Sequence, residues 1–215
     1  MFVRQVQNQF RVSKADVQMF YQNGTWNKPV GVSQIYMMLI GGGGVADGGG
    51  FSGNSGNVTT WFGAAQNVPD SLIVSPAIAV TTSSTIGNST TVSYRGSSLN
   101  TLLTATGGNF LQNANTADAA GTFANSGFYQ NVLGQTGTNT TPTASTTTFL
   151  SVAGAGNITA NYGYSATNTR PGYFLLQPVI VACATATASN NVAIGCGSYF
   201  NGTTAGAGFV LIASW

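Results

Sequence analysis

Apolar residues in this chain gather in short runs that turn residues separate. Residues 35–40 are apolar at every position, which is typical of a strand covered on both faces. Residues 90–94 alternate between polar and apolar positions, and residues 58–62 and 209–212 form two more short runs. The two aromatic residues that end the run 58–62 are candidate core side chains. Because the connections are short, the pattern predicts strands in antiparallel order.

Two further apolar runs contain a proline, which has no amide proton for the ladder of a central strand. Residues 72–80 hold Pro76 and are expected as an edge strand, a bulge or two short pieces. Residues 174–184 hold Pro178 and are expected at an edge or a bulge. Residues 192–196 are predicted as the strand that follows after a tight turn.

The composition favours strands and turns over helices. Thr, Ser, Asn and Gly are common, and these residues prefer caps, turns or strands to helix interiors. Between residues 100 and 148 we expect short strands and long loops, with residues 134–148 as a loop tip. We therefore predict an all-β fold: an antiparallel β-sandwich or jelly-roll-like domain with Gly-rich loops over residues 20–215, preceded by an arm at residues 1–19.

The predicted arm mixes aromatic, basic and amide side chains. Phe2, Arg4, Phe10 and Arg11 are its candidate anchoring residues. Such a segment can add a strand to another subunit or form the first strand of its own sheet. Basic residues gather before residue 30, which fits either docking on an acidic partner or a few solvated charges near a terminus.

Charge is scarce, because only 5% of the residues are Asp, Glu, Lys or Arg and the net charge is +2. This net charge is too small to indicate nucleic-acid binding, which normally shows as Lys and Arg clustered on one face. The chain has no His, the usual general base and a common metal ligand. The acidic residues are the widely spaced Asp16, Asp47, Asp70 and Asp118. We predict no enzyme activity, no metal and no cofactor, and a glycan-cleaving pair of carboxylates is the weakest alternative.

A glycine-rich segment follows the fully apolar run directly. Gly41–Gly44 and then Gly48–Gly50 are poor helix material, since each Gly costs about 1 kcal/mol relative to Ala in a helix. Such a run allows main chain to approach main chain closely. A phosphate-binding loop would need a Lys-Ser/Thr ending and a following helix, and the sequence predicts neither.

Glycine and aromatic motifs mark both ends of residues 20–215. The opening motifs are Phe20 or Tyr21, Gly24-Thr25-Trp26, Pro29, Gly31-Val32, the apolar run and Gly41–Gly44. The closing motifs are Gly206, Gly208, the apolar run 209–212 and Trp215. Together they resemble the glycine-rich domain of bacteriophage tail fibres and related virion surface proteins. The glycines after Gly50 are spread thin, which speaks against the stacked polyglycine helices of some fibre tips.

This resemblance implies a non-enzymatic structural protein on the surface of a phage virion, of the tail-fibre or receptor-binding type, that mediates host attachment. It implies a homotrimer that contacts other virion proteins and a host surface glycan or protein. The short region before residue 20 favours an alternative, a capsid-decorating or head-fibre protein held by its arm. No run approaches 18 apolar residues and residues 1–12 lack the core of a secretion signal, so we expect synthesis in the host cytoplasm without membrane insertion.

Aromatic residues among amide and hydroxyl side chains suit sugar or protein surfaces. Tyr129, Tyr162, Tyr164 and Tyr199 are predicted to lie in loops as receptor contacts, and packing against the sheet is the alternative for each.

The two cysteines fall on neighbouring predicted strands. Cys183 and Cys196 can face each other across a hairpin, which allows a cross-strand disulfide. Both flank small apolar residues, so two buried free thiols are the alternative.

Overall fold

The computed structural model describes residues 15–46, 53–94, 101–110, 123, 125–134, 148–149, 159–160, 194–195, 197–198 and 204–215. These residues form strands and one short 3-10 helix. In chain order the elements are β1 (Asp16–Phe20), β2 (Gly24–Asn27), β3 (Gln34–Ile40), β4 (Val58–Ala64), η1 (Ala65–Asn67), β5 (Ser71–Ser75), β6 (Thr90–Tyr94), β7 (Thr101–Ala105), β8 (Gly127–Val132), β9 (Thr148–Phe149), β10 (Thr159–Ala160) and β11 (Phe209–Ser214).

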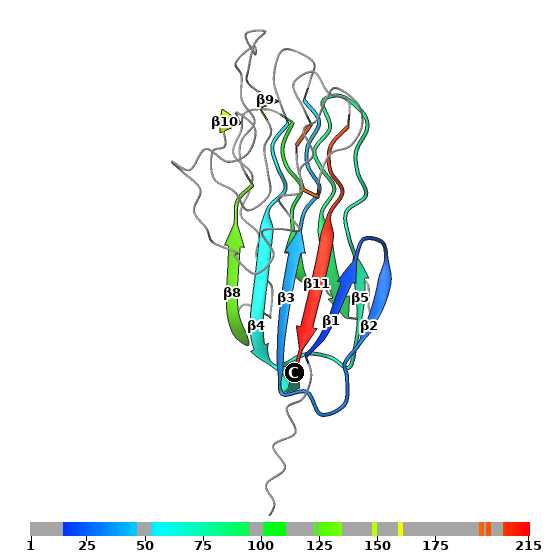
Figure 1. The fold of residues 1–215 in the computed structure, drawn as a ribbon, viewed down its shortest axis with the longest axis vertical. Coiled ribbons are helices and arrows are strands. Elements are labelled where there is room, and N and C mark those ends of the chain that lie inside the picture. Colours follow the sequence, from blue (N-terminus) through cyan, green and yellow to red (C-terminus); the bar gives the residue numbers. More distant parts are fainter. Residues whose placement is uncertain are drawn as a thin grey trace, which may run out of the picture.

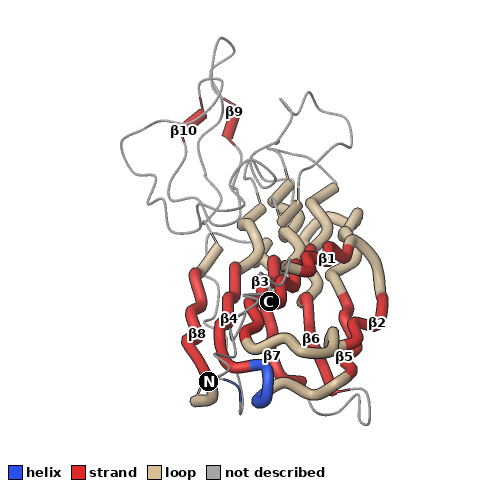
Figure 2. Tube along the Cα trace, turned by 60° about the horizontal axis from the view of Figure 1, so that its bottom comes forward, coloured by secondary structure: helices blue, strands red, loops and turns tan. Residues whose placement is uncertain are grey.

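Two antiparallel sheets form a β-sandwich (Figures 1 and 2). The five-stranded sheet has the order β1-β11-β3-β4-β8, and the four-stranded sheet has the order β2-β5-β6-β7. A separate two-stranded sheet pairs β10 with β9. The predicted all-β, antiparallel fold is confirmed, as are the strands expected at residues 35–40, 58–62, 90–94 and 209–212.

The core lies between the two sheets and consists of side chains from alternate positions of each strand. From β3 these are Ile35, Met37 and Leu39, which pack with Trp61 of β4. Trp26, Leu72, Val74, Val92 and Leu103 supply the four-stranded sheet's side of the core. Two-residue alternation explains this division, since successive side chains of a strand point to opposite faces.

Two sequence predictions need correction within these sheets. The core assignment of Phe62 is wrong, because Phe62 neighbours Trp61 on β4 and therefore points to the opposite face. Residues 72–80 were expected as an edge strand, a bulge or two short pieces, and the edge position is wrong because β5 pairs with both β2 and β6. The expected break at the proline is present, since β5 ends at Ser75, before Pro76. The strand keeps its internal position because the proline lies beyond it.

The boundary of the N-terminal arm also moves. Residues 16–19 were expected in the arm, but they belong to β1, which pairs with β11 from Asp16↔Ser214 to Phe20↔Val210. Residues 16–20 are therefore the first strand of the chain's own sheet. Phe2, Arg4, Phe10 and Arg11 lie outside the described residues.

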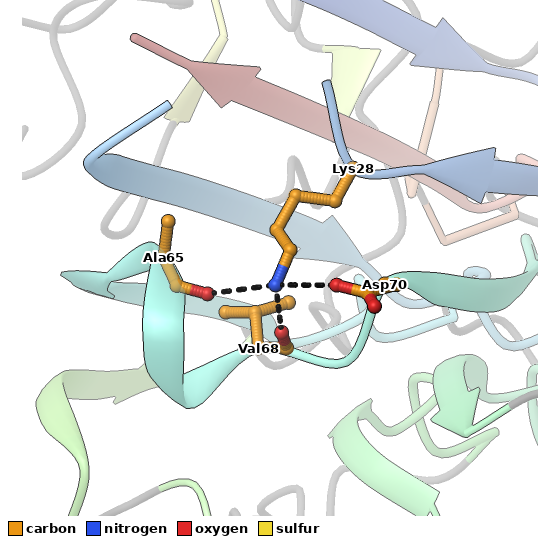
Figure 3. A network of polar contacts seen from close by, with 4 residues as sticks. All are labelled: Lys28, Ala65, Val68 and Asp70. Carbon is orange, nitrogen blue, oxygen red and sulfur yellow. Dashed lines mark hydrogen bonds and ion pairs between the residues drawn. The ribbon is translucent and has the colours of Figure 1, made fainter. Parts of the chain in front are cut away.

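At the end of the sandwich where β3 begins, one lysine side chain bonds to main-chain carbonyl groups and to an aspartate (Figure 3). The Lys28 Nζ donates to the carbonyl oxygens of Val68 (2.8 Å) and Ala65 (3.2 Å), and it pairs with Asp70 Oδ1 at 2.8 Å. Asp70 lies in the bend that leads from η1 to β5. Lys28 therefore ties that turn to the end of β2.

Beyond the other end of the sandwich, several strands continue as extended segments that run side by side (Figure 1). We call this region the main-chain bundle, and in the described residues it comprises segments 41–44, 53–57, 77–80, 85–88, 106–109 and 204–208 together with Gly195 and Ser198. Its hydrogen bonds run from main chain to main chain between segments that are distant in sequence.

These bonds repeat every third residue. Three consecutive N–H groups of the segment 41–44 donate to three different neighbours, and the fourth returns to the first neighbour. The bonds run from Gly41 to the Asn57 oxygen (2.9 Å), from Gly42 to Asn88 (3.0 Å), from Gly43 to Gly206 (2.9 Å) and from Gly44 to Asn54 (2.9 Å). A strand would alternate between two neighbours, whereas a polyproline II helix has three residues per turn.

The same period recurs in the segment 53–57. The N–H groups of Gly53 and Gly56 donate to the oxygens of Ser198 and Gly195, whereas those of Asn54 and Asn57 donate to Asn109 and Thr106. The expectation that spread-out glycines would prevent a polyglycine stack is therefore wrong. Glycines from separate parts of the chain meet in space, so a long glycine block is not required.

Glycine is needed in the bundle because the segments leave no room for side chains. A Cβ on Gly41 would overlap the Thr106 carbonyl, and one on Gly107 would overlap the main chain of Gly87. This confirms the prediction that the segment after residue 40 allows close approach of main chain to main chain.

Near the C-terminal part of the bundle, a predicted strand is interrupted. Ile194 and Gly195 form a turn, so the strand expected at residues 192–196 does not run through them. Gly195 has a φ of 68°, which is left-handed and unsuited to a strand. The run 174–184, Cys183 and Cys196 lie outside the described residues.

Candidate interaction surface

The five-stranded sheet has a second face that points away from the core, and we call it the outward sheet face. Residues opposite one another in neighbouring strands share a face. Starting from Tyr36 of β3, the pairings assign Phe62 and Phe128 on one side and Ala213 and Val17 on the other to this face. Its other members are Met19, Met38, Ile40, Val58, Thr60, Gln130, Val132, Phe209, Leu211 and Trp215.

A row of aromatic rings stands on this face. Phe62 of β4 lies 6.3 Å from Phe128 of β8, with an angle of 18° between the rings. On its other side, Phe62 lies 5.8 Å from Trp215, which follows β11, at an angle of 15°. Main-chain bonds hold Trp215 in place, because its N–H donates to the Gln34 oxygen (3.1 Å) and its oxygen accepts from the Gln34 N–H (2.9 Å).

The outward sheet face is open to solvent at both edges of the sheet. Phe128 is 79% exposed, and across the sheet Val17 and Met19 of β1 are 50% and 47% exposed. Toward the bundle the same face is buried at Met38, Ile40 and Phe209, and Tyr21, itself 58% exposed, packs on Phe209 with ring centroids 5.1 Å apart. The exposed side chains of the face therefore lie mainly at its two edges.

A hollow of about 450 Å³ lies beside Phe128. Residues of β3, β4 and β8 line it, among them Tyr36, Phe62, Phe128 and Gln130. Burial raises the pKa of the Tyr36 hydroxyl above its ordinary value, so this side chain is neutral at physiological pH. The hollow thus combines aromatic walls with neutral hydrogen-bonding groups.

No charged side chain lies on the outward sheet face as the structure describes it. In the described ranges the charged residues are Asp16, Lys28 and Asp70. Asp16 pairs with Ser214 on the face that Ile212 and Val210 share with the core, and Lys28 and Asp70 lie near η1. Contacts made by this face are therefore apolar or between neutral polar groups.

Among the sequence-predicted contact residues, Tyr129 is the one that the structure describes. It lies within β8 instead of a loop, packs against the core and also lines the hollow. Its placement in a loop was wrong, because the composition around residues 100–148 hid a six-residue strand. Tyr162, Tyr164 and Tyr199 lie outside the described residues.

Sequence reasoning missed the aromatic row itself. The alternation within β4 carried the signal for Phe62, because one of two adjacent aromatic residues in a strand must face away from the core. Phe128 was hidden in the same way as Tyr129. Trp215 was noted as a closing motif, but its contact with Phe62 depends on the order of strands in the sheet.

Chemically, the face can bind through ring contacts and apolar burial. Where the structure describes the chain, it brings together no group of three His, Cys, Asp or Glu side chains that would hold a metal ion. The same part of the chain contains no helix with the length and apolar character to cross a bilayer. Searches against models of known protein families and against curated proteins find no match to this chain.

Proposed function

We propose that the chain is a non-enzymatic structural protein displayed on the surface of a bacteriophage virion, of the tail-fibre or receptor-binding type. Its role would be to hold host-binding loops on a rigid support. The resemblance of its opening and closing glycine and aromatic motifs to the family of virion surface proteins supplies the virion context.

The main-chain bundle is the observation that carries this proposal. Its segments connect to strands of both sheets, for example 41–44 to β3 of one sheet and 106–109 to β7 of the other. Hydrogen bonds between main-chain groups fix these segments without mobile side chains. The connections that leave the bundle are therefore mounted on a support with few conformational options, as binding loops on rigid scaffolds commonly are.

The scarcity of charge supports a structural role. With 5% charged residues and no His, the chain offers few groups for proton transfer. The described residues instead use their polar groups to complete main-chain bonding, as Ser198 does by accepting from the Ala46 N–H (3.0 Å) and the Gly53 N–H (3.3 Å) through its hydroxyl oxygen.

Antibody labelling of purified phage particles tests the location. Label at the end of the tail supports the attachment role. Label over the head would replace it with the capsid-decorating alternative, and particles without label would contradict virion display altogether.

A competition assay tests attachment separately. Folded chain added before infection should reduce phage adsorption to host cells, because it occupies the host receptor. Heat-unfolded chain at the same concentration is the control and should leave adsorption unchanged. Equal adsorption with folded and unfolded chain would contradict receptor binding.

A further inference from the structure

The hollow beside Phe128 is a site that the proposed support role does not use. It lies on the five-stranded sheet, among residues of β3, β4 and β8, whereas the loops of the proposed support leave the main-chain bundle. Its volume of about 450 Å³ falls within the roughly 300–1,000 Å³ of common small-ligand sites. Its walls come from strands, which hold side chains more precisely than loops do. The hollow therefore has the size and the rigid frame of a ligand site.

The aromatic part of the hollow offers open ring surface. Phe128 is 79% exposed, so much of its ring is accessible to a ligand. Phe62 lies beside it, with ring centroids 6.3 Å apart and an angle of 18° between the rings. The face of an aromatic ring is apolar and carries partial negative charge, so it attracts a flat patch of C–H groups. This wall selects a ligand that has one apolar face.

The polar part of the hollow selects against a wholly apolar ligand. Tyr36 and Gln130 also line the hollow. In the described part of the chain, neither the Tyr36 hydroxyl nor the Gln130 amide hydrogen-bonds to another residue. A hydroxyl and an amide can each donate and accept, and a wholly apolar ligand would remove both from water without replacing their hydrogen bonds. These two groups favour a ligand that carries hydroxyl groups of its own.

Charge narrows the ligand class further. Among the described residues, no charged side chain lies on the outward sheet face, so an ionic ligand would lose hydration there without gaining an ion pair. A neutral sugar ring meets all three conditions, because it has a face of C–H groups, a rim of hydroxyl groups and no charge. We propose that the hollow binds a neutral saccharide, whose ring stacks on Phe128 and whose hydroxyl groups bond to Tyr36 and Gln130.

This inference goes beyond the proposed function, which assigns host binding to loops mounted on the bundle. It depends on the chemistry of the hollow and not on the location of the protein on a virion. Failure of the particle-labelling experiment would therefore leave the saccharide site intact. Failure of the chain to bind saccharides would leave virion display intact.

Titration calorimetry of the full chain with uncharged hexasaccharides of glucose, mannose, galactose and N-acetylglucosamine tests the proposal. The wild-type chain should bind at least one of them with a Kd of about 1 mM or tighter. Phe128→Ala should raise that Kd about tenfold, because it removes the stacking surface. Phe128→Tyr keeps the ring and should bind like the wild type. Val30→Ala is the matched control, since Val30 is fully exposed in the turn between β2 and β3, and it should also leave the Kd unchanged.

The polar contacts have a test of their own. Gln130→Ala should raise the Kd about fivefold, because the amide no longer bonds to a sugar hydroxyl. The Kd should be the same in low salt and in about 1 M salt, since no charged side chain takes part in binding. Gln130 is exposed on the edge strand β8, so this variant should fold. Circular dichroism checks both variants, and Gln130→Ala decides if Phe128→Ala does not fold.

Three results would overturn the proposal. The first is the absence of binding to all four hexasaccharides at concentrations up to about 10 mM. The second is an unchanged Kd in both Phe128→Ala and Gln130→Ala, which would place the sugar elsewhere on the chain. The third is binding of an apolar dye such as ANS without binding of any sugar, which would make the hollow a docking surface for an apolar partner.

Discussion

The sandwich and the main-chain bundle hold the same chain segments together by different means. In the sandwich, large side chains such as Trp61 and Leu72 are fully buried between two sheets. In the bundle, glycine replaces these side chains and main-chain groups bond directly to one another. One segment can pass from one mode to the other within a residue, as β3 does between Ile40 and Gly41. The sandwich should therefore tolerate small changes of side-chain volume, whereas the bundle should tolerate none.

The largest effect is expected from removing a core ring in the sandwich. Trp61 is buried, its Nε1 donates to the Phe123 oxygen (2.9 Å), and its ring lies 4.9 Å from the Phe123 ring. Trp61→Ala should lower the free energy of unfolding by about 4 kcal/mol, because it leaves a cavity and removes the hydrogen bond to the Phe123 oxygen. Urea denaturation measures this change. Val30→Ala is the exposed control, and an equally small loss in both variants would contradict the assigned core.

Adding a single methyl group to the bundle should cost almost as much. In Gly107→Ala the new Cβ meets the main chain of Gly87, which cannot move aside as a flexible side chain would. We expect a loss of about 3 kcal/mol in the free energy of unfolding, the upper end for overpacking. Hydrogen exchange should show the loss first at the amides of Gly108 and the segment 41–44.

Gly31→Ala separates this packing effect from backbone conformation. Gly31 has a φ of 85° and no atom within 4 Å of the position where a Cβ would lie. Its substitution should cost about 1 kcal/mol for the left-handed conformation alone. Equal losses of unfolding free energy in Gly31→Ala and Gly107→Ala would mean that the bundle has room for a Cβ at residue 107.

A third, smaller effect is expected where the two regions meet. The Thr90 hydroxyl accepts from the Ala77 N–H (2.9 Å) and donates to the Ile40 oxygen (2.6 Å), so it joins β6 to both segments that enter the bundle there. Thr90→Val keeps the shape and removes both bonds, which should cost about 2 kcal/mol of unfolding free energy. Thr91→Val, on the opposite face of β6, should change the free energy by less than about 0.5 kcal/mol.

The same comparison shows how far the sequence predicts this fold. Apolar runs such as residues 35–40 identified the strands, because side-chain burial leaves a periodic trace in the sequence. The bundle leaves no such trace, since Gly53, the pair Gly107-Gly108 and Gly208 are far apart in the sequence and the bonding partners of these segments are distant in the chain. A three-residue period is visible in the hydrogen bonds and not in hydrophobicity.

The candidate interface was predictable to a smaller extent than the core. Alternation within β4 separates Trp61 from Phe62 once the strand is recognised. Bringing Phe62 next to Phe128 and Trp215 requires the order β11-β3-β4-β8, and this order follows from strand pairings that the sequence does not encode locally. Contacts across non-consecutive strands are therefore the part that sequence reasoning could not supply.

The smallest effect is expected at the end of the sandwich that lies away from the bundle, where the Lys28 side chain donates to main-chain carbonyl groups. Lys28→Met keeps the aliphatic stem but removes the bonds to the oxygens of Val68 and Ala65, which should lower the unfolding free energy by about 1 kcal/mol. Asp70 is 94% exposed, so water screens its ion pair with Lys28 and Asp70→Asn should have a much smaller effect. Urea denaturation in low and high salt measures both. If Asp70→Asn lowered the unfolding free energy as much as Lys28→Met, or if high salt removed the effect of Lys28→Met, the ion pair and not the bonds to the carbonyl oxygens would hold this turn.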